Sequence, residues 1–149
     1  MNLTDKILGT GFARFKDRRF LEASMAASAL VAMADAHVHL SEQLAVDRVL
    51  ENIERLNVFD PRKAIDLHRQ FVHAMRANSG EGQDWALEAI GRFRGNEEAA
   101  DLLIRIARYT AHADQDLSGS ELMAIRRLCR ELGVDPEPYM VDISPDQAD

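Results

Sequence analysis

Apolar residues recur along most of the chain at steps of three and four, and very few segments alternate apolar and polar residues. Steps of three and four place side chains on one face of an α-helix, whereas alternation is typical of a strand. The pattern therefore predicts an all-α fold. The apolar faces of the expected helices are Leu21, Met25, Ala29, Ala32 and Met33; Val46, Val49, Leu50, Ile53 and Leu56; Ala64, Leu67, His68, Phe71 and Met75; Ala86, Ile90 and Phe93; Ala99, Leu102, Leu103, Ile106 and Thr110; and Ile125, Leu128, Cys129 and Leu132.

Proline, glycine and asparagine residues mark where these helices begin and end. Pro61 suits the first turn of a helix, and Asn96 can cap the start of another. Gly95 and Gly133 are expected to end the helices that precede them, because glycine readily adopts the left-handed conformation found at helix ends. The polar stretch 78–82 contains two glycines and predicts a loop.

A short polar pattern occurs twice in the chain, in residues 34–42 and again in residues 113–121. Each copy starts with Ala-Asp, has a branched aliphatic residue three positions after the Asp, and has a Glu seven positions after it. The two copies are 79 residues apart, and the flanking apolar residues keep the same offset. Such a match indicates internal duplication of a helix–turn–helix unit, with the polar residues in its turns.

One domain is expected to span residues 1–149, because a chain of this length with 46% hydrophobic residues can build one core. Its expected parts are an N-terminal arm (1–19), repeat one (20–58), connecting helices (59–95), repeat two (96–138) and an acidic tail (139–149). The arm mixes phenylalanines with basic residues. It either contacts an anionic membrane surface or partner, or packs its phenylalanines on the core, which we favour.

Composition narrows the range of functions. The net charge of −7 argues against nucleic acid as the main partner, because phosphate binding needs a basic face. The single cysteine, Cys129, cannot form a disulfide within the chain, which favours a reducing compartment. No stretch approaches the roughly 20 apolar residues that cross a bilayer. We therefore expect a cytoplasmic protein, with a peripheral membrane contact left open.

No motif in the chain indicates catalysis, so an enzyme is not expected. Cys129 lies on an apolar helical face and is expected to be a core residue rather than a nucleophile. The histidines at 68 and 73 have no recurring acidic partner, and Trp85 is expected to serve packing. Four methionines fall at helical spacing and are also expected in the core: Met25, Met33, Met75 and Met123.

The second copy of the polar pattern is a candidate cation site. Asp114, Asp116 and Ser118 place oxygen ligands at alternate positions, as the first half of a calcium loop does. An EF-hand is excluded, because the position that needs a bidentate glutamate is Ile125. Glu121 could still reach a cation bound by the turn. Alternatively, the serine and Glu121 form a capping box, which satisfies backbone N–H groups and needs no metal.

The first copy has a different set of potential ligands. His37 stands where the second copy has Asp116, and His39 stands where it has a serine. With Asp35 and Glu42, these imidazoles would suit zinc or nickel better than calcium. The spacing matches no closed zinc motif, so the histidines can equally be solvated loop residues. A metal-dependent hydrolase that uses both histidines is a third hypothesis.

Together these residues resemble the TerB family of tellurite-resistance proteins. The resemblance rests on the doubled acidic turn and on three stretches in a fixed order, which are Arg14–Phe20, Leu56–Asp60 and Asn96–Ala100. It covers the chain from about Phe15 to Tyr139. The resemblance implies a single helical domain of about seven helices, built from two pseudo-twofold-related repeats.

The resemblance also implies a function. TerB-like proteins are expected to be non-enzymatic, cytoplasmic members of the Ter response to tellurite and other chemical stress, associated with a membrane-bound Ter partner. Their acidic turns are proposed to chelate a divalent cation, and the matching residues here are Asp35, Glu42, Asp114, Asp116 and Glu121. The chain departs from the family where a glycine usually follows each turn aspartate, because Ala36 and Gln115 occupy those positions.

The leading hypothesis is therefore a TerB-like protein that binds calcium, magnesium, manganese or zinc at its acidic turns and docks on a membrane-associated protein. Its candidate metal ligands are the five matching acids together with His37. The alternative is a metal-free helical scaffold for protein interaction, in which the turn acids only cap helices. Neither the partner nor the oligomeric state follows from the sequence.

Overall fold

A computed structural model describes residues 18–34, 61–111 and 119–140, and the regular elements within these ranges are all helical. They are α2 (Arg18–Ala32), α4 (Pro61–Ala77), α5 (Ser79–Gly91), α6 (Glu97–Ala111), α7 (Gly119–Leu132) and a short 3₁₀ helix, η3 (Glu137–Tyr139). The predicted all-α fold is confirmed for this part of the chain. The helix expected around residues 46–56 lies outside it, so the total of about seven helices stays a prediction. No helix in these ranges is long and apolar enough to span a membrane.

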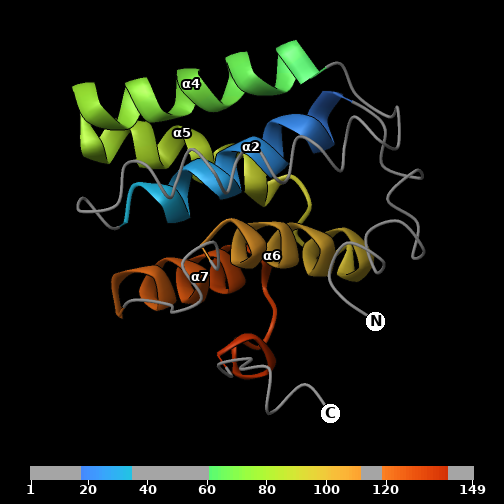
Figure 1. Cartoon of the computed structure of the whole chain (residues 1–149). Coiled ribbons are helices and arrows are strands. Elements are labelled where there is room, and N and C mark those ends of the chain that lie inside the picture. Colours follow the sequence, from blue (N-terminus) through green and yellow to red (C-terminus); the bar gives the residue numbers. More distant parts are fainter. Residues whose placement is uncertain (1–17, 35–60, 112–118, 141–149) are drawn as a thin grey trace.

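Helix α2 lies at the centre of the molecule. In Figure 1, α4 and α5 cover one side of it and α6 and α7 cover the other. Twelve of its 15 residues are buried, so it faces neighbours all round rather than along one stripe. At its N-terminal end, Phe20 packs edge-on against Phe93, with ring centroids 5.6 Å apart.

Small residues allow α2 to occupy this central position. Five of its buried residues are alanines and two more are serines, so neighbouring backbones can approach closely. A buried hydroxyl costs free energy unless it is hydrogen-bonded. Ser24 meets this requirement by donating to the backbone oxygen of Phe20, at 2.8 Å.

Several helix boundaries agree with the sequence signals. The side chain of Asn96 accepts a hydrogen bond from the backbone N–H of Ala99 at 3.1 Å, which caps the start of α6. Gly95 and Gly133 adopt φ values of 90° and 74°, in the left-handed region where glycine avoids the strain of a side chain. Helix α4 begins at Pro61. The predictions for Pro61, Asn96 and Gly133 are confirmed, whereas the prediction that Gly95 ends the preceding helix is wrong, because α5 ends at Gly91, four residues earlier.

The loop predicted over residues 78–82 is wrong. Only Asn78 separates α4 from α5, and its side chain accepts a hydrogen bond from the backbone N–H of Glu81 at 3.1 Å. Helix α5 therefore starts at once, in spite of two glycines in its first turn. Gly82 is needed there, because a Cβ atom at this position would lie 2.5 Å from the Cα of Met75 in α4. The glycine permits a close helix contact rather than a loop.

The two helices that precede the polar patterns correspond under the predicted offset. Helices α2 and α6 both contain 15 residues, and their bounds are 79 residues apart. They also pack against each other. The segment that would correspond to α7 in repeat one, around residues 40–53, lies outside the described residues. The pseudo-twofold repeat thus stays a prediction, and α2 and α6 are the one pair of described helices that corresponds under it.

Candidate functional site

The structure describes one of the six predicted metal ligands. Asp35, His37, Glu42, Asp114 and Asp116 lie outside the described residues. Glu121 lies half-buried in the first turn of α7. In the described ranges, no group of three or more His, Cys, Asp or Glu side chains could hold a metal ion. Because the other five candidates are not among these residues, the cation site remains a prediction.

Residues 35–42 and 112–118, which we call the acidic segments, hold most of the two copies of the polar pattern. The described residues show where these segments are attached. One follows Ala34 at the end of α2, and the other connects Ala111 of α6 to Gly119 of α7. Helices α2 and α6 run in the same direction, so both segments leave the bundle at the same end (Figure 1). A helix C-terminus carries negative dipole charge, which favours a cation nearby. The attachment points are therefore compatible with cation binding at either segment.

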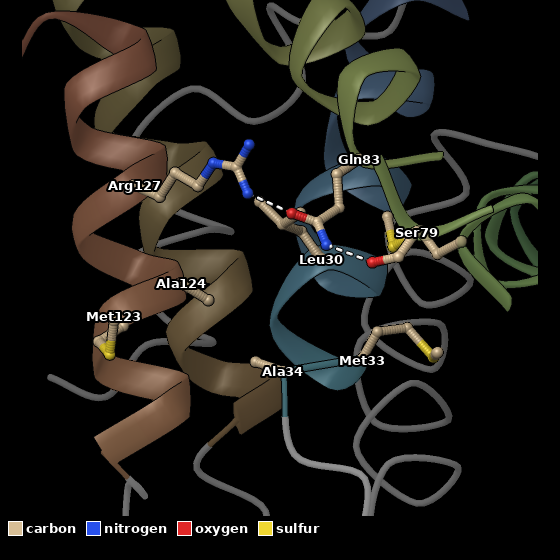
Figure 2. Close-up of a pocket in the computed structure, with 9 residues that line it drawn as sticks. Leu30, Met33, Ala34, Ser79, Gln83, Met123, Ala124 and Arg127 are labelled. Atoms are coloured by element: carbon tan, nitrogen blue, oxygen red, sulfur yellow. Dashed lines mark hydrogen bonds between the residues drawn. The ribbon is translucent and has the colours of Figure 1, made fainter. Parts of the chain in front are cut away.

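A pocket of about 250 Å³ opens at this same end of the molecule. It lies between the end of α2, the junction of α4 with α5, and the first half of α7 (Figure 2). Its apolar walls are formed by Leu30, Met33, Ala34, Met75, Met123 and Ala124, and we call it the methionine pocket. Ala34 directly precedes the first acidic segment, and α7 directly follows the second. The pocket thus borders the described ends of both.

A chain of hydrogen bonds forms the polar edge of the methionine pocket. Gln83 of α5 donates through Nε2 to the hydroxyl of Ser79 at 2.8 Å. Arg127 of α7 donates through Nη1 to the side-chain oxygen of the same Gln83. Figure 2 shows Gln83 between its two partners, so that the guanidinium reaches from α7 toward α5. One cationic group is therefore held at the edge of an otherwise apolar pocket.

The methionines of this pocket were expected in the core, and only part of that expectation is correct. Met75 is buried, Met33 is half-buried, and Met123 is 73% exposed. The prediction for Met123 is wrong. It lies two residues before Ile125, whereas members of one helical face are three or four residues apart. Strict use of the spacing would have placed it off the buried face of α7.

The buried titratable groups fit structural roles. Burial, and to a lesser extent the charge of Asp135, raises the pKa of the Cys129 thiol to about 11, so the thiol is protonated and a poor nucleophile. Tyr139 of η3 donates to Asp101 of α6 at 2.6 Å. Burial and this bond raise the pKa of the Tyr139 phenol. Cys129 is fully buried, so the prediction that it belongs to the core is confirmed.

The indole of Trp85 and the imidazole of His68 lie outside the methionine pocket. Trp85 packs on Phe71 with ring centroids 4.1 Å apart, as expected for a packing residue, although it is 41% exposed. The Nε2 atom of His68 is shielded from solvent and has no hydrogen-bond partner in the described part of the chain. Burial, and secondarily the charge of Arg69, lowers the pKa of His68 to about 4. This imidazole is therefore neutral at physiological pH.

Comparison with known proteins places these features in a family. The family model described as tellurite resistance protein TerB matches residues 21–140, a range that includes both acidic segments and the methionine pocket. A tellurium resistance protein TerB from Alcaligenes sp is 26% identical over 93 residues, which are 62% of this chain and 76% of that protein. No solved structure gives a significant match. TerB is not a known family of enzymes. Since the family model covers most of the chain, the protein belongs to the TerB family.

Proposed function

We propose that this protein is a non-enzymatic component of a response to tellurite or related chemical stress. In this proposal it binds a divalent cation at its two acidic segments and docks on a membrane-associated protein partner. The observation that carries the proposal is the TerB match over residues 21–140, which contains all six candidate ligands. The name printed for the relative from Alcaligenes sp, a tellurium resistance protein, supports the same role.

Electrostatics supplies the mechanism that we propose for the cation. The candidate carboxylates follow the C-termini of α2 and α6 in the sequence, and like charges that are brought together in one site repel each other when no cation is bound. A hard divalent cation relieves this repulsion by coordinating several oxygens at once. It would also fix the segments that adjoin the methionine pocket. Cation occupancy would then alter the surface that a partner contacts, which is how a local charge change acts as a switch.

A metal-free scaffold is the second candidate function, and one described residue favours it. Glu121 lies in the first turn of α7, where a carboxylate stabilises the positive end of the helix by about 0.3–1 kcal/mol without any metal. In this case the repeated acids would only stabilise the N-terminal ends of helices, and the protein would function by binding other proteins without a metal. The two candidates make opposite predictions about added cations.

Calorimetric titration with calcium, magnesium, manganese and zinc tests the cation proposal. We expect at least one of these ions to bind the full chain, and we expect the double variant Asp114→Asn, Glu121→Gln to lose that binding. The matched control is Asp84→Asn, Glu88→Gln, which removes the same charge from two exposed carboxylates of α5. The control should bind the ion as the wild type does.

Two results would contradict the cation proposal. One is the absence of binding by all four ions, and the other is binding that survives in the Asp114, Glu121 double variant. The scaffold candidate instead predicts that this variant lowers the melting temperature by the same amount with and without a chelator. The same calorimetric and thermal data therefore separate the two functions.

A further inference from the structure

We propose that the methionine pocket and the adjoining exposed face of α7 bind an acidic peptide segment of a protein partner. One bulky apolar side chain of the peptide enters the pocket, and its carboxylates lie on the arginines of α7. This inference rests on the proposed function, because it names the surface and the chemistry by which the protein docks. It requires no cation for binding itself.

The pocket has the size and flexibility to receive one large side chain. A cavity of roughly 150 Å³ accommodates a benzene-sized group. The volume of about 250 Å³ therefore has room for a leucine, methionine or phenylalanine side chain. Three of its wall residues are methionines, whose unbranched thioether side chains adapt to different partners. The pocket thus favours an apolar anchor without demanding one particular shape.

The exposed face of α7 adds a row of positive charge next to the pocket. Arg126, Arg127 and Arg130 follow Met123 at steps of three, four and seven, so all four residues lie on one side of the helix. All are exposed. We call the three arginines the arginine stripe. Arg127 and Met123 also line the pocket, so the stripe and the pocket form one continuous surface.

The arginine stripe has no acidic partner among the described residues. Three other arginines do form ion pairs there, as Arg18 and Arg92 each contact Glu22 and Arg105 contacts Asp101 at 2.9 Å. No such pair is found in the described ranges for any arginine of the stripe, and Arg127 is held by the neutral Gln83. The chain has a net charge of −7, and an exposed row of arginines without ion pairs to the described residues selects an acidic partner by charge complementarity.

A peptide fits this surface better than a membrane does. Insertion into a lipid surface needs a broad exposed apolar face. In the described part of the chain, the large exposed apolar residues are Met123 of α7 and Trp85 of α5. A single concave pocket beside charged groups instead matches one anchor side chain flanked by carboxylates. Guanidinium groups also bind carboxylates in a bidentate geometry, which adds orientation to the attraction.

Fluorescence anisotropy with labelled peptides tests this proposal on the full chain. Each probe is a short peptide with one central leucine, methionine or phenylalanine between glutamates. We expect one of these peptides to bind, and we expect its affinity to fall when the anchor is replaced by serine or the glutamates by glutamine. The variant Arg126→Gln, Arg127→Gln, Arg130→Gln should bind about fivefold more weakly, since three exposed and therefore individually weak ion pairs are lost.

The matched control removes three charges from another exposed surface. The variant Lys63→Gln, Arg69→Gln, Arg76→Gln changes α4 alone and alters the net charge by the same amount. It should retain wild-type affinity, and circular dichroism should show that both triple variants remain folded. Equal losses of affinity in the two variants would overturn the proposal, because the effect would then reflect overall charge.

Two further results would also overturn it. In the first, no peptide binds but vesicles of phosphatidylcholine and phosphatidylserine do, in a manner that depends on the arginine stripe. In the second, peptides bind only after residues 141–149 are removed, so that the acidic tail of the chain itself occupies the surface. Failure of the cation titration leaves peptide binding standing, and absence of peptide binding leaves cation binding standing. The two proposals can therefore fail separately.

Discussion

A single buried imidazole sets a pH dependence of stability. Nε2 of His68 is shielded from solvent, and burial together with the charge of Arg69 lowers the pKa of His68 from 6.5 to about 4. The unfolded chain therefore binds more protons than the folded chain between these two pH values. The contribution of the neutral imidazole to stability is complete above pH 6.5. It falls as the pH drops toward 4, by up to about 3 kcal/mol.

Replacing this imidazole should reduce the loss of unfolding free energy that accompanies acidification. We expect His68→Phe to lose less free energy of unfolding between pH 7 and pH 4.5 than the wild type loses, as measured by urea denaturation at both pH values. Carboxylates contribute to the pH dependence of both proteins. The difference between the two proteins in the change of unfolding free energy with pH is therefore the contribution of His68. His73→Gln, at an exposed position of the same helix, serves as the control and should keep the wild-type slope. Equal slopes for His68→Phe and the wild type would contradict this prediction.

The contact between α4 and α5 depends on the absence of a side chain at Gly82. A Cβ atom there would lie 2.5 Å from the backbone N and Cα of Met75, and backbone atoms cannot move aside cheaply. Gly82→Ala should therefore destabilise the protein by about 1–3 kcal/mol, even though alanine favours a helix by roughly 1 kcal/mol. Gly80→Ala is the matched control, since its nearest neighbour would be the side chain of Asn78 at 3.7 Å. Thermal denaturation should show a loss for Gly82→Ala alone, and equal stability of the two variants would refute the argument.

At the scale of elements, local sequence signals predicted which segments are helical better than they predicted how successive helices are joined. Apolar spacing located the buried faces, and Asn96 and Gly133 marked a true start and a true end. The stretch 78–82 was predicted as a loop because glycine usually interrupts helices. The stretch also holds a local signal for a helix start, because Asn78 caps the backbone N–H of Glu81. What no local pattern contains is the closeness of α4, which requires the glycine at position 82. Local rules thus failed where a contact between elements requires the unusual residue.

At the scale of the whole molecule, the candidate site was only partly predictable. The duplicated pattern pointed to the acidic segments, although five of the six candidate ligands lie outside the described residues. The methionine pocket could not be predicted, because its lining residues come from three separate stretches of the chain. The arginines of α7 are visible in the sequence. Their lack of acidic partners in the described ranges depends on how the helices pack.

The two proposed sites should influence each other, because the described helix ends that lead into the acidic segments border the methionine pocket. Ala34 lines the methionine pocket and directly precedes Asp35 of the first acidic segment. A bound cation would neutralise carboxylates beside the surface that receives an acidic peptide, and so it would reduce their repulsion of the peptide. We therefore expect the cation to tighten peptide binding by about fivefold.

Thermodynamic linkage makes this coupling testable in both directions. The peptide must tighten cation binding by the same factor by which the cation tightens peptide binding, because the four binding steps form a closed cycle. Anisotropy titrations with and without the cation, and calorimetric cation titrations with and without the peptide, measure the two factors. The control is Asp114→Asn, Glu121→Gln, in which the cation should leave peptide affinity unchanged. A cation that binds without changing peptide affinity would show that the acidic segments and the arginine stripe act independently, and a cation that weakens peptide binding would contradict the expected relief of repulsion.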